Sequence, residues 1–192
     1  NEATLGVPGR MARAHSLTRI GALHAAQDST GAARQAYGEA LVVLHALADD
    51  EAKDGARLPK DAALPQALMR VYAAIGDLHV AAGEGEAAVA ARQQQVRFAE
   101  AVAACEPGDS DVDPELSWAY NQLASLLQQL GQIPQALGMW QRDLELDRRR
   151  VATAPDDSER AWDLSISLNH VGDALLAMEQ AGGFLVGDAK EI

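Results

Sequence analysis

A small residue recurs at a nearly constant spacing along the chain, and this recurrence constrains the fold more than any other feature of the sequence. The four anchor residues are Gly21, Gly76, Ala124 and Gly172, separated by 55, 48 and 48 residues. Twelve positions after the first three anchors a second small residue follows, at Ala33, Ala88 and Ala136. In the fourth copy Phe184 stands at that position. The recurrence predicts stacked supersecondary units rather than one conventional core.

Each copy is predicted to be an antiparallel helix hairpin. Alanine dominates the apolar residues, aromatic residues make up only 4% of the chain, and strand-like alternation is missing. Small residues on both helices let them approach closely where they cross. The longer first spacing is explained by an insertion near 53–61. The expected helices cover about 9–27, 31–54, 62–82, 85–105, 114–130, 133–154 and 158–179.

Charge and composition argue against several classes of partner. The formal net charge is −12, which disfavours nucleic acids and anionic membranes as partners and leaves solubility or a preference for basic partners. A single cysteine, Cys105, permits neither an intrachain disulfide nor a cysteine-based metal cluster. The sequence has no run of 18 apolar residues, so no membrane span is expected.

No pattern typical of catalysis is found in the sequence. Metalloprotease, serine-hydrolase, phosphate-loop and dinucleotide patterns are missing, so we expect no catalytic residue, no metal site and no cofactor. His24 and His79 lie at the same place in the first two copies, which favours a half-buried structural role. The basic run at 148–150 is interpreted as positive charge at a helix C-terminus, with an acidic partner as the alternative.

The positions around each anchor resemble the tetratricopeptide repeat. Bulky apolar residues precede each anchor by four and by one positions, as in that family. They are Leu17, Tyr72, Tyr120 and Leu168, then Ile20, Ile75, Leu123 and Val171. The resemblance covers about residues 11–178, although a period of 48 rather than 34 is closer to the extended repeats of bacterial multidomain proteins.

The resemblance implies an all-α, right-handed superhelical solenoid of antiparallel helix hairpins. One repeat domain is expected over residues 1–180, with units at about 11–61, 62–112, 113–157 and a partial unit at 158–180. Residues 181–192 are expected to form an irregular tail or a truncated repeat, because their glycines do not suit a second helix.

The family binds peptides in a groove lined by the first helix of each hairpin, and its groove positions can be transferred to this chain. The candidate groove residues are Arg19, Arg70, Asp77, Trp118, Asn121, Gln122, Ser125, Asn169, His170 and Asp173. Asparagine and glutamine suit a peptide backbone, and tryptophan suits an apolar anchor. Thr18 and Ala22 occupy positions that a carboxylate clamp would need, so that mode is not expected. The alternative is that these residues are merely solvated, or that the groove holds a helix of the parent protein.

The function expected from the sequence is therefore a non-catalytic protein- or peptide-binding scaffold. We expect it to be a fragment of a larger bacterial regulatory protein, located in the cytoplasm. One alternative is a structural module that self-associates through its terminal repeats. Another is an accessory region of an enzyme whose catalytic domain lies elsewhere.

Overall fold

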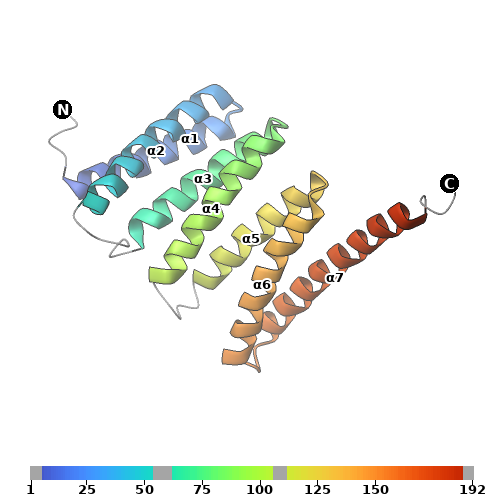
Figure 1. The fold of residues 1–192 in the computed structure, drawn as a ribbon. Helices are drawn as coiled ribbons and strands as arrows, with labels where there is room; N and C mark the ends of the chain where they lie inside the picture. The colour runs from blue at the N-terminus through green and yellow to red at the C-terminus, as the bar shows by residue number, and fades with distance from the viewer. Residues whose placement is uncertain (1–5, 54–61, 106–111, 188–192) are drawn as a thin grey trace. The chain divides into compact units, whose positions relative to one another are not determined.

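The protein is all-α in the part that the structure describes. A computed structural model describes residues 6–53, 62–105 and 112–187, and in these ranges it contains seven helices and no strand (Figure 1). The predicted insertion near 53–61 and the end of the predicted tail lie outside these ranges. Contacts divide the chain into two compact units, Asn1–Val112 and Asp113–Ile192, and each is described by itself. Within the described helices, none has the length and apolar character needed to cross a membrane.

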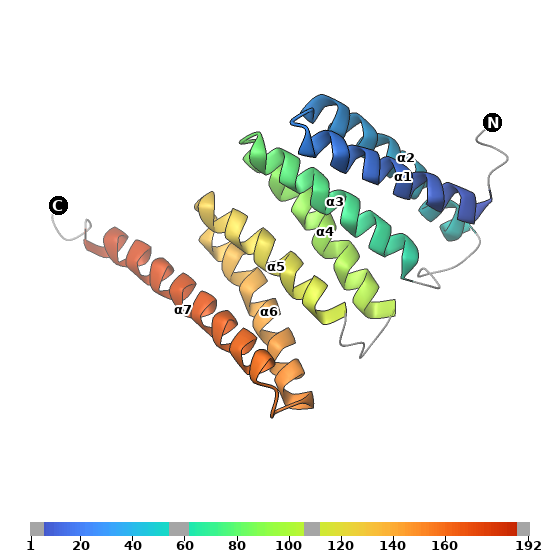
Figure 2. The same ribbon diagram turned by 180° about the vertical axis from the view of Figure 1, so that it is seen from behind.

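The first unit consists of two packed helix hairpins. Helices α1 (Val7–Ala26) and α2 (Thr30–Lys53) form one hairpin, and α3 (Ala63–Ala81) and α4 (Gly85–Cys105) form the other. Both α1 and α2 contact α3, so the hairpins lie side by side (Figures 1 and 2). Large apolar side chains fill the layer between them. The largest fully buried ones are Leu44, Leu47, Leu68 and Val71.

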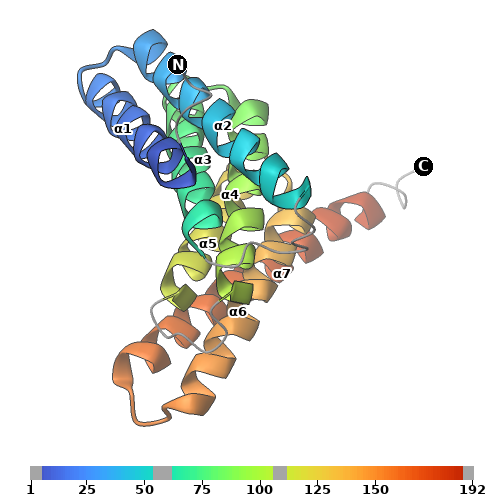
Figure 3. The same cartoon turned by 90° about the vertical axis from the view of Figure 1, so that its left-hand side faces the viewer.

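The second unit contains three helices. Helix α5 (Val112–Gln129) and helix α6 (Ile133–Thr153) are joined by a short turn as a third hairpin, in which Asn121 donates to Asp143 (Figures 1 and 2). Helix α7 (Ser158–Gly187) packs against α6 (Figure 3). Asp157 caps α7, because its Oδ1 accepts the backbone N–H groups of Glu159 and Arg160 at 3.0 and 3.2 Å. The described part of this unit therefore holds one hairpin and one further helix.

Six of the seven helices are confirmed within two residues of their predicted ends. The exception is α7, which continues to Gly187 instead of ending near residue 179. The prediction assigned residues 181–192 to an irregular tail or a truncated repeat, because the segment with Gly182 and Gly183 did not suit the second helix of a hairpin. A single glycine costs a helix interior only about 1 kcal/mol relative to alanine, so two of them near a helix end do not stop it.

The turns inside the three complete hairpins share one backbone geometry. Asp28, Gly83 and Gly131 adopt left-handed φ angles of 56°, 71° and 74°. The backbone N–H of the next residue then donates to a carbonyl near the helix end, as in a Schellman motif. The pairs are Ser29 to His24, Glu84 to His79, and Gln132 to Leu127. These turns are 55 and 48 residues apart, which is the spacing of the anchors.

The anchors are small because a large side chain from the second helix lies over them. A Cβ atom added to Gly21 would lie 2.5 Å from the Tyr37 ring, and one added to Gly76 would lie 3.0 Å from Nε of Arg92. Ala33, Ala88 and Ala136 are fully buried on the facing helices. Gly172 differs, because a Cβ there would meet nothing within 4 Å. The fourth anchor therefore lacks, among the described residues, the covering side chain that Gly21 and Gly76 have.

Candidate functional site

A pocket of about 470 Å³ opens between the three helices of the second unit. Helix α5 supplies one wall, α7 supplies the opposite wall, and α6 forms the floor. The lining residues are Pro114, Ser117, Trp118, Asn121, Gln122 and Ser125 from α5, Asp143, Asp147 and Arg150 from α6, and Asp163, Ile166, Ser167 and His170 from α7. Their spacing of three or four residues places each set on one helix face.

Two aspartates are buried in the floor of this pocket. Asp143 and Asp147 lie one turn apart on α6, and each is only 1% exposed. Buried carboxylates are unfavourable unless hydrogen bonds or opposite charges compensate for the lost water. The neighbours of these two groups therefore decide how the site behaves.

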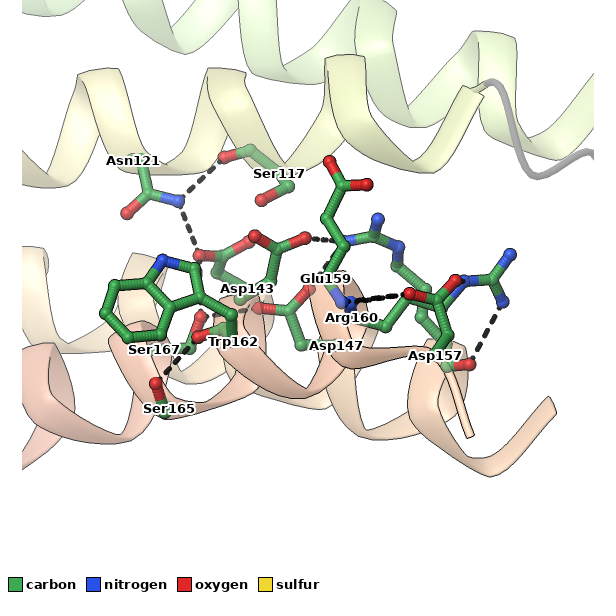
Figure 4. A network of polar contacts seen from close by, with 12 residues as sticks. Ser117, Asn121, Asp143, Asp147, Asp157, Glu159, Arg160, Trp162, Ser165 and Ser167 are labelled. Atoms are coloured by element: carbon green, nitrogen blue, oxygen red, sulfur yellow. Dashed lines mark hydrogen bonds and ion pairs between the residues drawn. The ribbon is translucent and has the colours of Figure 1, made fainter. Parts of the chain in front are cut away.

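The Ser167 hydroxyl links the two carboxylates. Its Oγ lies 2.6 Å from Oδ2 of Asp147 and 3.2 Å from Oδ2 of Asp143 (Figure 4). The hydroxyl carries one hydrogen, so it can donate to only one carboxylate at a time. The shorter distance favours donation to Asp147, and Asp143 then needs another donor. Asn121 provides it, because its Nδ2 lies 2.5 Å from Oδ2 of Asp143 and also donates to the Ser117 carbonyl.

Arg150 compensates Asp147 but not Asp143. Its Nη1 lies 2.9 Å from Oδ1 of Asp147 and 3.0 Å from Oδ2 of Asp163 on α7. Burial alone would lower the pKa of Arg150, but these two carboxylates outweigh burial and raise it. The guanidinium is thus a fixed positive charge shared by two acids.

No positively charged group among the described residues acts on the carboxyl group of Asp143. Burial raises its pKa above the ordinary value, and the negative charge of Asp147 acts in the same direction. Hydrogen bonds from Ser117, Asn121 and Ser167 oppose the rise without cancelling it. None of the groups that act on Asp143 carries positive charge, so its proton is held more tightly than that of an exposed aspartate.

Several buried polar atoms at this site have no hydrogen-bond partner among the described residues. Those on lining residues are Oδ1 of Asn121, Oδ1 of Asp143 and Nδ1 of His170. The indole Nε1 of Trp140 is also unpaired, and its ring stacks on His170 at 5.3 Å between centroids. Such groups are rare in native interiors, and their concentration around one pocket marks it as a place where a ligand can supply partners.

The rim of the pocket carries exposed apolar side chains. Trp118 is 62% exposed on α5, and Ile166 is partly exposed on α7. Large exposed apolar residues beside a polar floor are typical of binding surfaces.

The structure brings together five of the ten predicted groove residues. Trp118, Asn121, Gln122, Ser125 and His170 line the pocket.

The other five predicted residues lie outside the pocket. Asn169 and Asp173 are exposed on α7 but do not line it, because they point away from the stripe formed by residues 163, 166, 167 and 170. Arg19, Arg70 and Asp77 are exposed in the first unit, where Asp77 pairs with Nη2 of Arg92 at 2.5 Å.

The sequence prediction missed the floor of the pocket. It assigned ligand contacts to the first helix of each hairpin and treated Arg150 as a helix-end charge, whereas Arg150 pairs with two aspartates. A signal was present, because residues 136, 140, 143, 147 and 150 have the spacing of one helix face, and Ala136 and Trp140 are core residues. Acidic residues in such a stripe indicate a buried polar site.

The part of the chain that the structure describes contains no cluster of side chains that could bind a metal ion. No three histidine, cysteine, aspartate or glutamate side chains there lie close enough to share an ion. Because Arg150 already compensates Asp147 and Asp163, the carboxylates are arranged for salt bridges and hydrogen bonds.

Comparison with known proteins does not assign the chain to a family. The sequence matches no protein-family model, and a search of curated proteins finds no significant match. The resemblance to tetratricopeptide repeats therefore stays a prediction from the residue pattern.

Proposed function

We propose that the chain is a non-catalytic protein-binding domain and that the pocket of the second unit receives part of the partner. The observation that carries this proposal is an open pocket with unpaired polar groups in its walls and an exposed tryptophan at its rim. Tryptophan is enriched among the residues that dominate binding energy at protein interfaces. A volume of about 470 Å³ is sufficient for one or two side chains of a partner.

The repeated features of the three hairpins support a tetratricopeptide-like scaffold. The turns and the anchors recur at the same two spacings, and the second small residue is buried in each copy. Stacking of the hairpins into a right-handed superhelix, within a larger bacterial regulatory protein, is the arrangement that we propose for them.

Capture of partners with a pocket variant tests the proposed function. The purified chain and a Trp118→Asp variant would be used to capture proteins from lysate, and the affinity of each captured protein would then be measured with purified components. A Val42→Asp variant is the matched control, because Val42 is 71% exposed on α2 in the first unit. We expect a protein that binds the unaltered chain and the control but not Trp118→Asp. Identical capture by all three would contradict the proposal.

Self-association is a second candidate, favoured by the exposed apolar side chains of α7. Leu168, Leu175, Leu176 and Met178 are all exposed on this helix, where a following hairpin helix would be expected. A second copy of the chain could cover them. Light scattering over a range of concentrations tests this candidate, and a Leu175→Asp, Leu176→Asp variant should reduce the measured mass. A mass that stays monomeric at high concentration would reject it.

A further inference from the structure

We propose that the pocket binds the side-chain ammonium group of a lysine on the partner, with Asp143 as its acceptor and Trp118 and Ile166 against its aliphatic stem. This inference rests on the proposed function and names the chemistry of the partner.

The first argument is the charge balance of the pocket. Three aspartates and one arginine line it, and Arg150 is within 3.0 Å of both Asp147 and Asp163. Among the described residues, the groups that act on Asp143 are Ser117, Asn121, Ser167 and the like charge of Asp147, and none of them is positive. A buried carboxylate of this kind is complementary to an added positive charge.

The second argument is the set of unpaired acceptors. Oδ1 of Asp143 in the floor and Oδ1 of Asn121 in the wall are both buried, and neither has a hydrogen-bond donor among the described residues. Each can accept hydrogen bonds, so a ligand with several N–H groups would satisfy both. Both oxygens are covered in the free chain, and the ligand would reach them through rotation of the surrounding side chains.

The arrangement of these acceptors favours an ammonium over a guanidinium. A guanidinium pairs best with both oxygens of one carboxylate, in a bidentate fork. Oδ2 of Asp143 already accepts from Asn121 at 2.5 Å and lies 3.2 Å from Ser167 Oγ, so this carboxylate has only Oδ1 to offer. An ammonium is a compact charge with three freely rotating donors and can bridge acceptors from two different side chains.

The rim suits the remainder of a lysine side chain. Lysine places its methylene stem along apolar surfaces while its charge reaches a polar site. Trp118 and Ile166 stand at the rim on opposite walls and are both exposed, so they can flank such a stem. The ring of Trp118 would also attract a cation that passes over its face.

Binding of a cation should lower the pKa of Asp143. Burial raises the pKa of this carboxyl, whereas a bound ammonium favours the ionised form. The charged and titratable groups around it are Asp147 and Arg150 on α6 and Asp163 and His170 on α7, while α5 contributes only neutral groups to this part of the pocket. Affinity for lysine should therefore rise with pH.

Three pools of short peptides test the inference without a known partner. Each pool has randomised flanks around a fixed central residue, which is lysine, arginine or norleucine. Retention on the immobilised full chain would be compared with retention on Asp143→Asn and Glu145→Gln. Both substitutions remove one negative charge from α6, but Glu145 is exposed and does not line the pocket.

We expect the unaltered chain to retain the lysine pool at least about tenfold better than the norleucine pool, and also better than the arginine pool. Asp143→Asn should abolish this preference and Glu145→Gln should keep it. Equal retention of the lysine and norleucine pools, or the same lysine preference in both variants, would overturn the inference. The comparison of pools on the unaltered chain stays decisive even if Asp143→Asn does not fold.

Failure here can be separated from failure of the proposed function. A partner lost with Trp118→Asp, combined with no preference for lysine, would support the binding domain and reject the lysine site. A lysine preference that depends on Asp143, without any partner captured through Trp118, would support the lysine site and reject the proposed capture of a partner through Trp118.

Discussion

Helices α2 and α6 have the same place in their hairpins but differ in what they bury. Four positions on each helix correspond at a constant separation of 103 residues. In α2 they hold Tyr37, Ala40, Leu44 and Leu47, and in α6 they hold Trp140, Asp143, Asp147 and Arg150. The stripe of α2 is apolar except for one phenol group, whereas that of α6 carries three charged side chains. Ala40, Leu44, Asp143 and Asp147 are all almost completely buried.

Helix α4 is intermediate between these two. The corresponding residues are Arg92, Gln95, Ala99 and Val102, and all four are buried. Arg92 donates to Oε1 of Gln95 at 2.7 Å and to Asp77 at 2.5 Å, so its charge is compensated. The hairpin therefore tolerates apolar, mixed or charged residues on the second helix.

This difference indicates that the charges of α6 are not required for forming a hairpin. The α1–α2 hairpin packs with leucines at equivalent positions, and burial of leucine stabilises a fold without the cost of removing charges from water. Local departures from the pattern that suits the fold are typical of functional sites. The polar floor of the second unit is therefore consistent with the binding site that we propose for it.

The largest expected effect comes from making α6 resemble α2 at one position. Arg150→Leu introduces the residue that α2 has at the equivalent Leu47. It also leaves Asp147 buried beside Asp163 without a positive charge. We expect the free energy of unfolding to fall by about 3 kcal/mol, measured by urea denaturation.

Arg149→Leu is the matched control for that experiment. Arg149 is the exposed neighbour of Arg150 on the same helix, and its replacement should change the free energy of unfolding by less than about 0.5 kcal/mol. Equal effects of the two substitutions would mean that the ion pairs of Arg150 do not stabilise the second unit.

The anchors provide a second comparison between the units. Gly21→Ala places a methyl group 2.5 Å from the Tyr37 ring, so the hairpin must shift, and we expect a loss of about 2 kcal/mol in unfolding free energy. Gly172→Ala meets nothing within 4 Å and replaces a helical glycine, so we expect a gain of about 0.5–1 kcal/mol.

Thermal unfolding of the two variants measures whether stability falls in Gly21→Ala and rises in Gly172→Ala. A loss at both positions would show that Gly172 is covered as Gly21 is, for example by a second copy of the chain. A gain at both would mean that Tyr37 moves aside without cost and that the first anchor does not depend on its size.

The helices could be predicted from sequence because their determinants are local. Gly83 and Gly131 mark turns that need left-handed backbone, and the alanine-rich segments between turns have no competing strand pattern. The end of α7 was wrong because two glycines near a helix terminus weaken it too little to end it. The recurrence of small residues could be read directly from the sequence, but the structure covers Gly21 and Gly76 with a side chain and leaves Gly172 uncovered among the described residues.

Five of the thirteen residues that line the candidate site could be predicted, because four residues on α5 and His170 on α7 occupy groove positions of the repeat that the sequence resembles. The floor could not be predicted from those positions, because it depends on how three helices converge. The sequence gives no sign that Ser167 contacts Asp143 and Asp147, because these contacts join residues on two different helices. The pairing of Arg150 with Asp163, 13 residues away, also arises only in the folded hairpin.

The smallest expected effect concerns the pH dependence of stability at Asp143. Because its pKa is raised above the ordinary value of 3.8, the folded chain holds this proton more tightly than the unfolded chain. The stability that this group contributes is therefore present below pH 3.8 and is lost as the pH rises through the raised pKa.

Asp143→Asn removes this titration and keeps an oxygen that can accept from Asn121. The unfolding free energy of the variant, relative to that of the unaltered chain, should rise across this window, because only the unaltered chain loses the contribution of Asp143 there. Glu145→Gln, on the exposed face of the same helix, should show no such rise. Urea denaturation at a series of pH values measures both, and the other titratable groups nearby, Asp147, Asp163 and His170, are present in all three proteins. A difference in unfolding free energy between Asp143→Asn and the unaltered chain that stays constant with pH would mean that Asp143 is ionised as readily as an exposed aspartate. The contrast between the apolar stripe of α2 and the charged stripe of α6 would then have no effect on the pKa of Asp143.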